Sequence, residues 1–141
     1  MKQSGVLIAL IVFIAAVSVA LTTEQRRAGS HTLKSTLSSP RKDNAGGEFR
    51  VALNVGRSQV CYGLSVHSVG APTAAQIRAG KVNEAGPVVV SIPTPANDFS
   101  NQCLTVDTAH LQDIAENPDK YYVNVTTQEF PDGALQGQLG K

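Results

Sequence analysis

Cys61 and Cys103 are the residues whose chemistry is most directly constrained, because the chain contains no other cysteine. An even cysteine count in an exported chain indicates a disulfide, and two cysteines allow only one pairing. Free thiols or metal ligands are the alternatives, although neither cysteine has a histidine or cysteine partner at zinc-like spacing. A bridge that closes roughly forty residues is expected to stabilise the fold by about 4 kcal/mol.

The three histidines, His31, His67 and His110, lie in separate segments and share no spacing typical of a metal site. A single histidine is more often structural or solvated than a ligand. The sequence also lacks a nucleophile elbow, a zinc-protease motif, a phosphate-binding loop and a dinucleotide fingerprint. We therefore expect no catalytic residue, no bound metal and no cofactor, so the chain is not predicted to be an enzyme.

The first segment predicts that the chain leaves the cytoplasm. Residues 5–21 carry no charge, Lys2 precedes them, and Ser18 and Ala20 supply small residues for cleavage after Ala20. These are the parts of a secretory signal peptide. The alternative is membrane attachment through an uncleaved anchor, since seventeen apolar residues lie at the lower limit for crossing a bilayer. Either outcome for residues 1–21 places the rest of the chain in a secreted, periplasmic or extracellular location, free or membrane-anchored.

Residues 22–45 are predicted to be a flexible linker. Eight of the nineteen residues from 22 to 40 are Ser or Thr, and no hydrophobic period is sustained. Residues 21–44 hold five basic and two acidic side chains, a charge of +3 that could contact an anionic membrane surface. Residues 45–141 hold six basic and nine acidic side chains, a charge of −3. This balance argues against nucleic-acid binding, which needs concentrated Lys and Arg.

Residues 46–141 are predicted to form an all-β domain. Apolar residues alternate over 49–55 and again over 60–66, which predicts a hairpin with a turn at 56–58. Runs at 87–92 and 121–127 predict buried strands, and a Pro-Asp-Gly turn at 131–133 leads into a last strand at 134–139. One short helix is expected over 109–116. The pattern favours an Ig-like antiparallel β-sandwich or barrel with one short helix.

The order of these motifs resembles the chordin-type domain, the CHRD domain. The resemblance rests on the segments at 60–64, 71–75, 83–90, 114–118, 121–125 and 129–139, and covers about residues 46–140. The last block is the most specific, since it combines a strand, a Phe-Pro-x-Gly-Ala turn and a Gly-Gln-Leu ending. The resemblance implies an extracellular, Ig-like β-sandwich without established enzymatic activity.

This chain departs from the CHRD pattern at three positions where the family usually carries histidine. Gln76, Arg78 and Thr126 stand there instead. Glutamine is a poor metal ligand, and the arginine guanidinium has no lone pair to offer. We therefore carry no metal site over from the family, and interpret the three residues as a polar cluster on the corresponding surface.

The expected function is an extracytoplasmic binding or scaffolding module. Its predicted contact surface is a loop over residues 71–84, with Thr126 nearby, and its partner would be an unknown extracellular protein or glycan. The residues proposed for contact are Gln76, Arg78, Lys81, Asn83 and Thr126. Asn124 begins an Asn-Val-Thr sequon and is a candidate for glycosylation. The alternatives are a purely structural envelope or matrix protein and a metal-dependent redox protein on a superoxide-dismutase-like sandwich.

Overall fold

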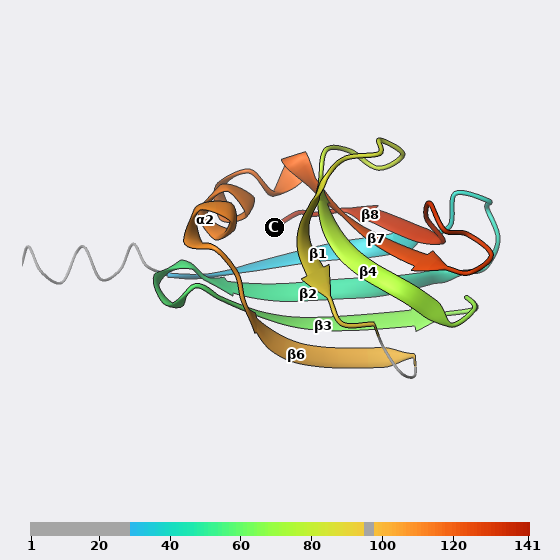
Figure 1. The fold of residues 1–141 in the computed structure, drawn as a ribbon, viewed down its shortest axis with the longest axis horizontal. Helices are drawn as coiled ribbons and strands as arrows, with labels where there is room; N and C mark the ends of the chain where they lie inside the picture. The colour runs from blue at the N-terminus through green and yellow to red at the C-terminus, as the bar shows by residue number, and fades with distance from the viewer. Residues whose placement is uncertain (1–28, 95–97) are drawn as a thin grey trace, which may run out of the picture.

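A computed structural model describes residues 29–94 and 98–141, and shows one antiparallel sheet of eight strands (Figure 1). The segment predicted as a signal peptide or anchor, 1–21, and the first part of the predicted linker lie outside the described residues. Across the sheet the strand order is β5-β4-β7-β8-β1-β2-β3-β6. The elements are β1 (Ser30–Ser38), β2 (Gly46–Asn54), η1 (Val55–Arg57), β3 (Gln59–His67), β4 (Pro72–Ala79), β5 (Val88–Ile92), β6 (Phe99–Thr105), α2 (Thr108–Glu116), η2 (Pro118–Lys120), β7 (Tyr121–Thr127) and β8 (Leu135–Gln138).

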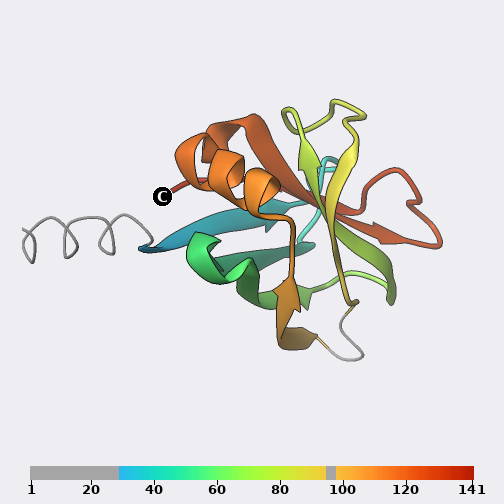
Figure 2. The same ribbon diagram turned by 60° about the vertical axis from the view of Figure 1, so that its left-hand side comes forward.

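The sheet curls so that one face encloses the hydrophobic core. In two views, β4 and β5 lie across the core from β2 and β3 (Figures 1 and 2). Alternate residues of each strand point inward, as the two-residue period of a strand requires. Core side chains from several strands are almost fully buried; they include Leu33, Phe49, Leu64, Ile77 and Val123. The predicted all-β antiparallel fold with one short helix is confirmed.

The hairpin predicted from alternation is present as β2 and β3. Phe49, Val51 and Leu53 are buried on β2, and the two strands pair in continuous register from Gly46↔His67 to Asn54↔Gln59. The strands predicted at 121–127 and 134–139 correspond to β7 and β8. The strand at 87–92 corresponds to β5, but it lies at an edge of the sheet, and Val88 is 43% exposed. The strand predicted to be buried is therefore buried only at Val90 and Ile92.

The predicted flexible linker over 22–45 is wrong for the part that the structure describes. Ser30–Ser38 forms β1, which lies inside the sheet between β8 and β2. Leu33 and Leu37 are 1% and 2% exposed, and Ser35, midway between them, is also buried. The period of two was hidden because a serine occupies its middle position. The β-domain therefore begins at or before residue 30, not at residue 46.

The predicted loop at 71–84 is also wrong over most of its length, because Pro72–Ala79 forms β4. This strand pairs with β5 on one side and with β7 on the other. Ala75 and Ile77 point into the core and are 2% and 1% exposed. The strand was missed because its inward positions carry only one large apolar residue. Strand β6 was missed as well, because few of its residues are buried.

Helix α2 closes one end of the sheet, as predicted from its apolar face. Leu111, Ile114 and Ala115 are buried against the core. The Tyr121 hydroxyl donates a hydrogen bond to the Asp113 carboxylate, which joins the helix to the start of β7. This hydrogen bond lowers the pKa of Asp113, while burial and the same contact raise the pKa of Tyr121 to about 12. Within residues 29–94 and 98–141, no helix is long and apolar enough to cross a membrane.

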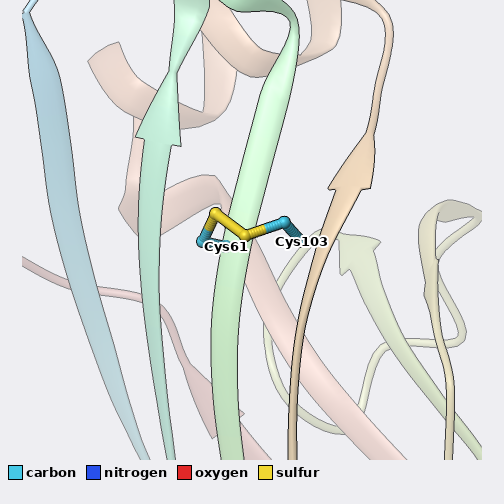
Figure 3. The surroundings of a disulfide bond; sticks show 2 residues. All are labelled: Cys61 and Cys103. Atoms are coloured by element: carbon cyan, nitrogen blue, oxygen red, sulfur yellow. A yellow bond between two sulfur atoms is a disulfide. The ribbon is translucent and has the colours of Figure 1, made fainter.

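The predicted disulfide joins Cys61 and Cys103 across two neighbouring strands (Figure 3). The two residues are direct partners in the β3–β6 register, and their Cα atoms are 4.0 Å apart. Strand β6 pairs with β3 alone among the strands of the sheet. The bridge therefore fastens an edge strand that contributes little buried apolar surface of its own.

Replacing both cysteines in the Cys61→Ser/Cys103→Ser variant should lower the free energy of unfolding by about 4 kcal/mol, because the unfolded chain regains the entropy of an open loop. Urea unfolding followed by circular dichroism measures this difference. Reduced wild-type protein is the matched control and should unfold at the same urea concentration as the variant. A loss below about 1 kcal/mol would show that the β3–β6 pairing holds without the bridge.

Removing β1 should prevent the domain from folding, because β1 is the strand through which β8 and β2 are connected within the sheet. A chain that begins at Ser39 should show no cooperative thermal transition and little dispersion in its amide NMR spectrum. A chain that begins at Gly29 is the control and should unfold cooperatively. Cooperative unfolding of the shorter chain would contradict the assigned role of β1.

Candidate binding surface

The polar positions of β4 and β7 share the face of the sheet that points away from the core, here called the outer face. Gln76 is the direct partner of Asn124, and Arg78 is the direct partner of Tyr122. Their neighbours Ala75, Ile77, Val123 and Val125 point into the core. Strand alternation therefore brings the predicted residues Gln76 and Arg78 onto one surface.

Residues 80–86, which connect β4 to β5, fold back over the outer face of β7 and β8 and are here called the pinned loop. Two glutamines of β8 hold the backbone of this loop. Gln136 Oε1 accepts a hydrogen bond from the Asn83 amide at 2.8 Å, and Gln138 Oε1 accepts one from the Val82 amide at 3.2 Å. Gln138 Nε2 also donates to the Gly80 carbonyl at 3.0 Å.

Tyr122 fastens the far end of the pinned loop. Its hydroxyl donates to the Glu84 carbonyl and accepts from the Gly86 amide at 3.3 Å. Gly86 is required at this point, because a Cβ atom there would clash with the Ala79 carbonyl oxygen. These contacts explain how Tyr122 can be 1% exposed on a face that points away from the core. They also fix the loop backbone before any partner arrives.

A hollow of about 400 Å³ lies beside the pinned loop and is here called the outer hollow. The loop forms one wall, and the turn between β7 and β8 forms another. Its lining mixes polar and apolar surface in about equal parts and carries one basic and two acidic side chains. The lining residues are Pro40, Arg78, Asn83, Glu84, Ala85, Tyr122, Asp132, Gly133 and Gln136. A smaller hollow of about 220 Å³ continues from it and shares Pro40, Asn83 and Gln136.

Two buried donors on this face have no acceptor among the described residues. They are Nε of Arg78 and Nδ2 of Asn124. The Asn124 side chain uses only its oxygen, which accepts from Gln136 Nε2 at 2.9 Å. A buried donor without a partner costs about 1–3 kcal/mol, so an acceptor brought to this face would recover part of that cost. Arg78 also lines the outer hollow, where an approaching oxygen could reach its guanidinium.

The structure gathers some of the sequence-predicted contact residues and separates others. Arg78 and Asn83 line the outer hollow, Gln76 lies on the same face, and Lys81 is exposed on the pinned loop. Thr126 is 8% exposed, and its hydroxyl hydrogen-bonds to the Thr73 hydroxyl at 3.0 Å. The interpretation of Thr126 as a surface contact is therefore wrong, because its hydroxyl serves to join β7 to β4.

Asn124, the candidate glycosylation site, lies inside the folded domain. Asn124 is fully buried, and its side-chain oxygen already accepts a hydrogen bond from Gln136. A glycan attached to Nδ2 needs open solvent around the amide, which a site beneath neighbouring side chains does not provide. The Asn-Val-Thr pattern alone does not reveal that Asn124 is buried in the fold.

Another hollow, of about 670 Å³, lies elsewhere, at the end of the sheet beside Arg41 and Phe130. The Arg41 guanidinium stacks 3.5 Å from the centre of the Phe130 ring, and its Nε contacts Asp43 at 3.0 Å. A backbone hydrogen bond from Ala45 lowers the pKa of Asp43, and Arg41 lowers it further. Because Arg41 is already paired within the chain, its charge adds little to the basic surface expected for the linker.

No group of three or more potential metal-ligating side chains occurs within residues 29–94 and 98–141. His31, His67 and His110 are each exposed and lie on different elements. Gln76 and Arg78 share one face of β4, and neither supplies a metal ligand. The arrangement of the described residues therefore offers hydrogen bonds and charge rather than coordination chemistry.

Sequence reasoning missed the residues that shape the site from below, namely Tyr122, Gln136 and Gln138. Their signal was present, since the Gln-Gly-Gln segment at 136–138 belonged to the most specific block of the sequence. Gly137 between the glutamines lets β8 approach β1, because a Cβ atom there would clash with Ser35 Oγ. Gln136 and Gln138 alternate on the outer face of β8, and their side-chain amides bind the backbone of the pinned loop.

The Gln136→Ala change should free the pinned loop, because it removes the acceptor of the Asn83 amide and the donor to Asn124. We expect faster hydrogen exchange at the Asn83 amide and a loss of about 1–2 kcal/mol in the free energy of unfolding. The control is Gln112→Ala on α2, which breaks only an exposed contact with Glu116. Unchanged exchange at Asn83 would contradict the role given to Gln136.

Residues 17–139 match the family model of the CHRD domain. This range includes β1 and extends further toward the N-terminus than the segments quoted from the sequence, in keeping with the corrected domain start. Searches of curated proteins and of solved structures return no significant match.

Proposed function

Since the chain belongs to the CHRD domain family, we propose that it is an exported binding module that holds an extracellular partner at the outer face of β4, β7 and β8. The CHRD domain is an extracellular type of domain, and the Cys61–Cys103 disulfide fits an oxidising compartment. The uncharged run at residues 5–21, which precedes the described residues, supports export through a signal peptide or retention as an anchor.

The observation that carries this proposal is a loop whose backbone is fixed while the side chains of Lys81 and Asn83 enter no hydrogen bond or ion pair among the described residues. Three side chains, Tyr122, Gln136 and Gln138, hold the pinned loop by its amides and carbonyls. Lys81 is exposed at the surface of this loop, and Arg78 enters no ion pair among the described residues. A loop ordered in advance loses little conformational entropy on binding, which favours recognition.

The chemistry of the outer hollow suits a polar partner. Arg78 offers a buried donor without an acceptor, while Glu84 and Asp132 offer acceptors across the same hollow. Carbonyl and carboxylate oxygens of a polypeptide, or hydroxyl groups of a glycan, would satisfy Arg78. The site positions no nucleophile beside a general base, so the proposal assigns binding and no catalysis.

The test measures binding of the purified mature protein to the envelope or matrix fraction of the cells that make it. Arg78→Glu should weaken saturable binding at least about tenfold, because it places a carboxylate where an acceptor of the partner would sit. The control is Arg57→Glu, which makes the same charge reversal in η1, outside the outer hollow. Separate treatment of the fraction with proteases and glycosidases identifies the class of partner.

Binding that survives Arg78→Glu unchanged would move the contact surface away from the outer hollow. An absence of saturable binding by the wild-type protein would favour the purely structural alternative, in which the domain fills an envelope or matrix without a specific partner. Thermal unfolding of Arg57→Glu should match the wild type, because Arg57 is exposed, and Arg78→Glu should still unfold cooperatively, which separates a loss of binding from a loss of folding.

A further inference from the structure

Strand β6 leaves one long side without a strand partner among the described residues. Phe99–Thr105 pairs with β3 and forms the last strand of the sheet in that direction (Figure 1). An edge strand presents a row of unpaired amide and carbonyl groups, and proteins usually protect such a row from pairing with another chain. Whether β6 is protected depends on its outward-facing backbone groups and on the presence of charged residues, prolines or bulges.

The backbone groups that face outward can be assigned from the contacts on either side of the strand. The Val66 amide donates to the Asp98 carbonyl at 2.8 Å, and the Val106 amide donates to the Ser58 carbonyl at 2.9 Å. Residues 98 and 106 therefore bond toward β3, and so do the even-numbered residues between them, because orientation alternates along a strand. The short Cα–Cα distance at Cys103 fits a pair without backbone hydrogen bonds.

The odd-numbered residues consequently direct their amide and carbonyl groups away from β3. They are Phe99, Asn101, Cys103 and Thr105, and all four are exposed. The strand contains no charged residue and no proline, and the β3–β6 register runs without a bulge. The usual means of protecting an edge are therefore missing from this strand.

The opposite edge of the sheet, β5, is also free of charged residues, but it is protected in other ways. Strand β5 has five residues, and its pairing with β4 is interrupted by a register shift between Ile77 and Arg78. Pro87 and Pro93 flank it on either side. Short length, a bulge and flanking prolines are features that discourage pairing with another chain. Of the two edge strands, β6 is therefore the one that is open to pairing with another chain.

We propose that β6 pairs in antiparallel fashion with β6 of a second copy of this chain, around a two-fold axis at Gln102. This register places Phe99 opposite Thr105 of the partner subunit, and Asn101 opposite Cys103 of the partner subunit. Every outward amide and carbonyl of both strands then meets a partner. A shift of two residues in either direction leaves one outward-facing residue of each strand unmatched, so this register is preferred.

The side chains agree with the same register. Phe99, which is 58% exposed, lies against the β-branched Thr105 of the partner subunit, a favourable cross-strand pair. Gln102 meets Gln102 of the partner subunit, and no like charges face each other because the strand is uncharged. A single ladder covers less surface than the roughly 1,600 Å² of a standard interface, so the dimer should be weak and dependent on concentration.

Sedimentation velocity of the full chain, with its disulfide intact, tests the proposal between about 1 μM and about 1 mM. The wild type should shift from monomer toward dimer across this range. Gln102→Lys should raise the dissociation constant at least about tenfold, because two ammonium groups would face each other at the two-fold axis. Ser91→Lys on the β5 edge is the matched control and should dimerise as the wild type does.

Cysteine trapping tests the register itself. With Gln102→Cys, the two new thiols would lie on Cα atoms about 4.5 Å apart, within reach of a disulfide, and a covalent dimer should form on oxidation. With Ser100→Cys, the two new thiols would lie roughly 13 Å apart along the strands and should not cross-link. Peptide mapping should show the Cys61–Cys103 bridge retained in both variants.

Wild-type protein that stays monomeric up to about 1 mM overturns the proposal. So does a dimer that is indifferent to Gln102→Lys, or equal cross-linking of the two cysteine variants. None of these three outcomes bears on the outer hollow, because Arg78 and Gln102 lie on strands at different positions of the sheet. Failure of the dimer and failure of partner binding are therefore distinguishable.

Discussion

The fold depends on the narrow junction between β1 and β8, where two parts of the sheet meet. Strands β5, β4, β7 and β8 lie to one side of it, and β1, β2, β3 and β6 lie to the other. The junction is formed by the pair Ser38↔Gln136 and by a bridge between Lys34 and Gly140. Gly137 permits this approach because any side chain there would clash with β1. The curl of the sheet, and with it the enclosure of the core, follows from this contact.

The same short segment also builds the candidate binding surface. Gln136 and Gln138 flank Gly137, and while the glycine faces β1, the glutamines hold the pinned loop on the outer face. One run of three residues therefore sets both the packing of the sheet and the position of the loop. This double structural role explains why the Gln-Gly-Gln segment belongs to the most specific block of the CHRD pattern. The explanation requires no particular ligand.

Sequence reasoning identified the elements whose inward positions are large and apolar, such as β2, β3 and α2. It failed for β1 and β4, where the small residues Ser35 and Ala75 occupy buried inward positions. Small residues at inward positions look like linker or loop in the sequence. Of the site, Arg78 and Asn83 were identified, but the burial of Asn124 and Thr126 was not. Asn124 is bonded to Gln136 of β8 and Thr126 to Thr73 of β4, and strand periodicity does not encode such contacts between strands.

The position of β1 has a consequence for the order of folding. The first described strand of the chain and the last one are neighbours in the sheet, so the junction between them closes only after residues 135–140 are free. The β1–β2–β3 meander can form earlier, since its contacts are local, but its core face stays open to water until the final strand arrives. While residues 135–140 are still inside a ribosome or a membrane channel, the sheet is thus held in an unfinished state, and the final structure forms only once these residues have emerged.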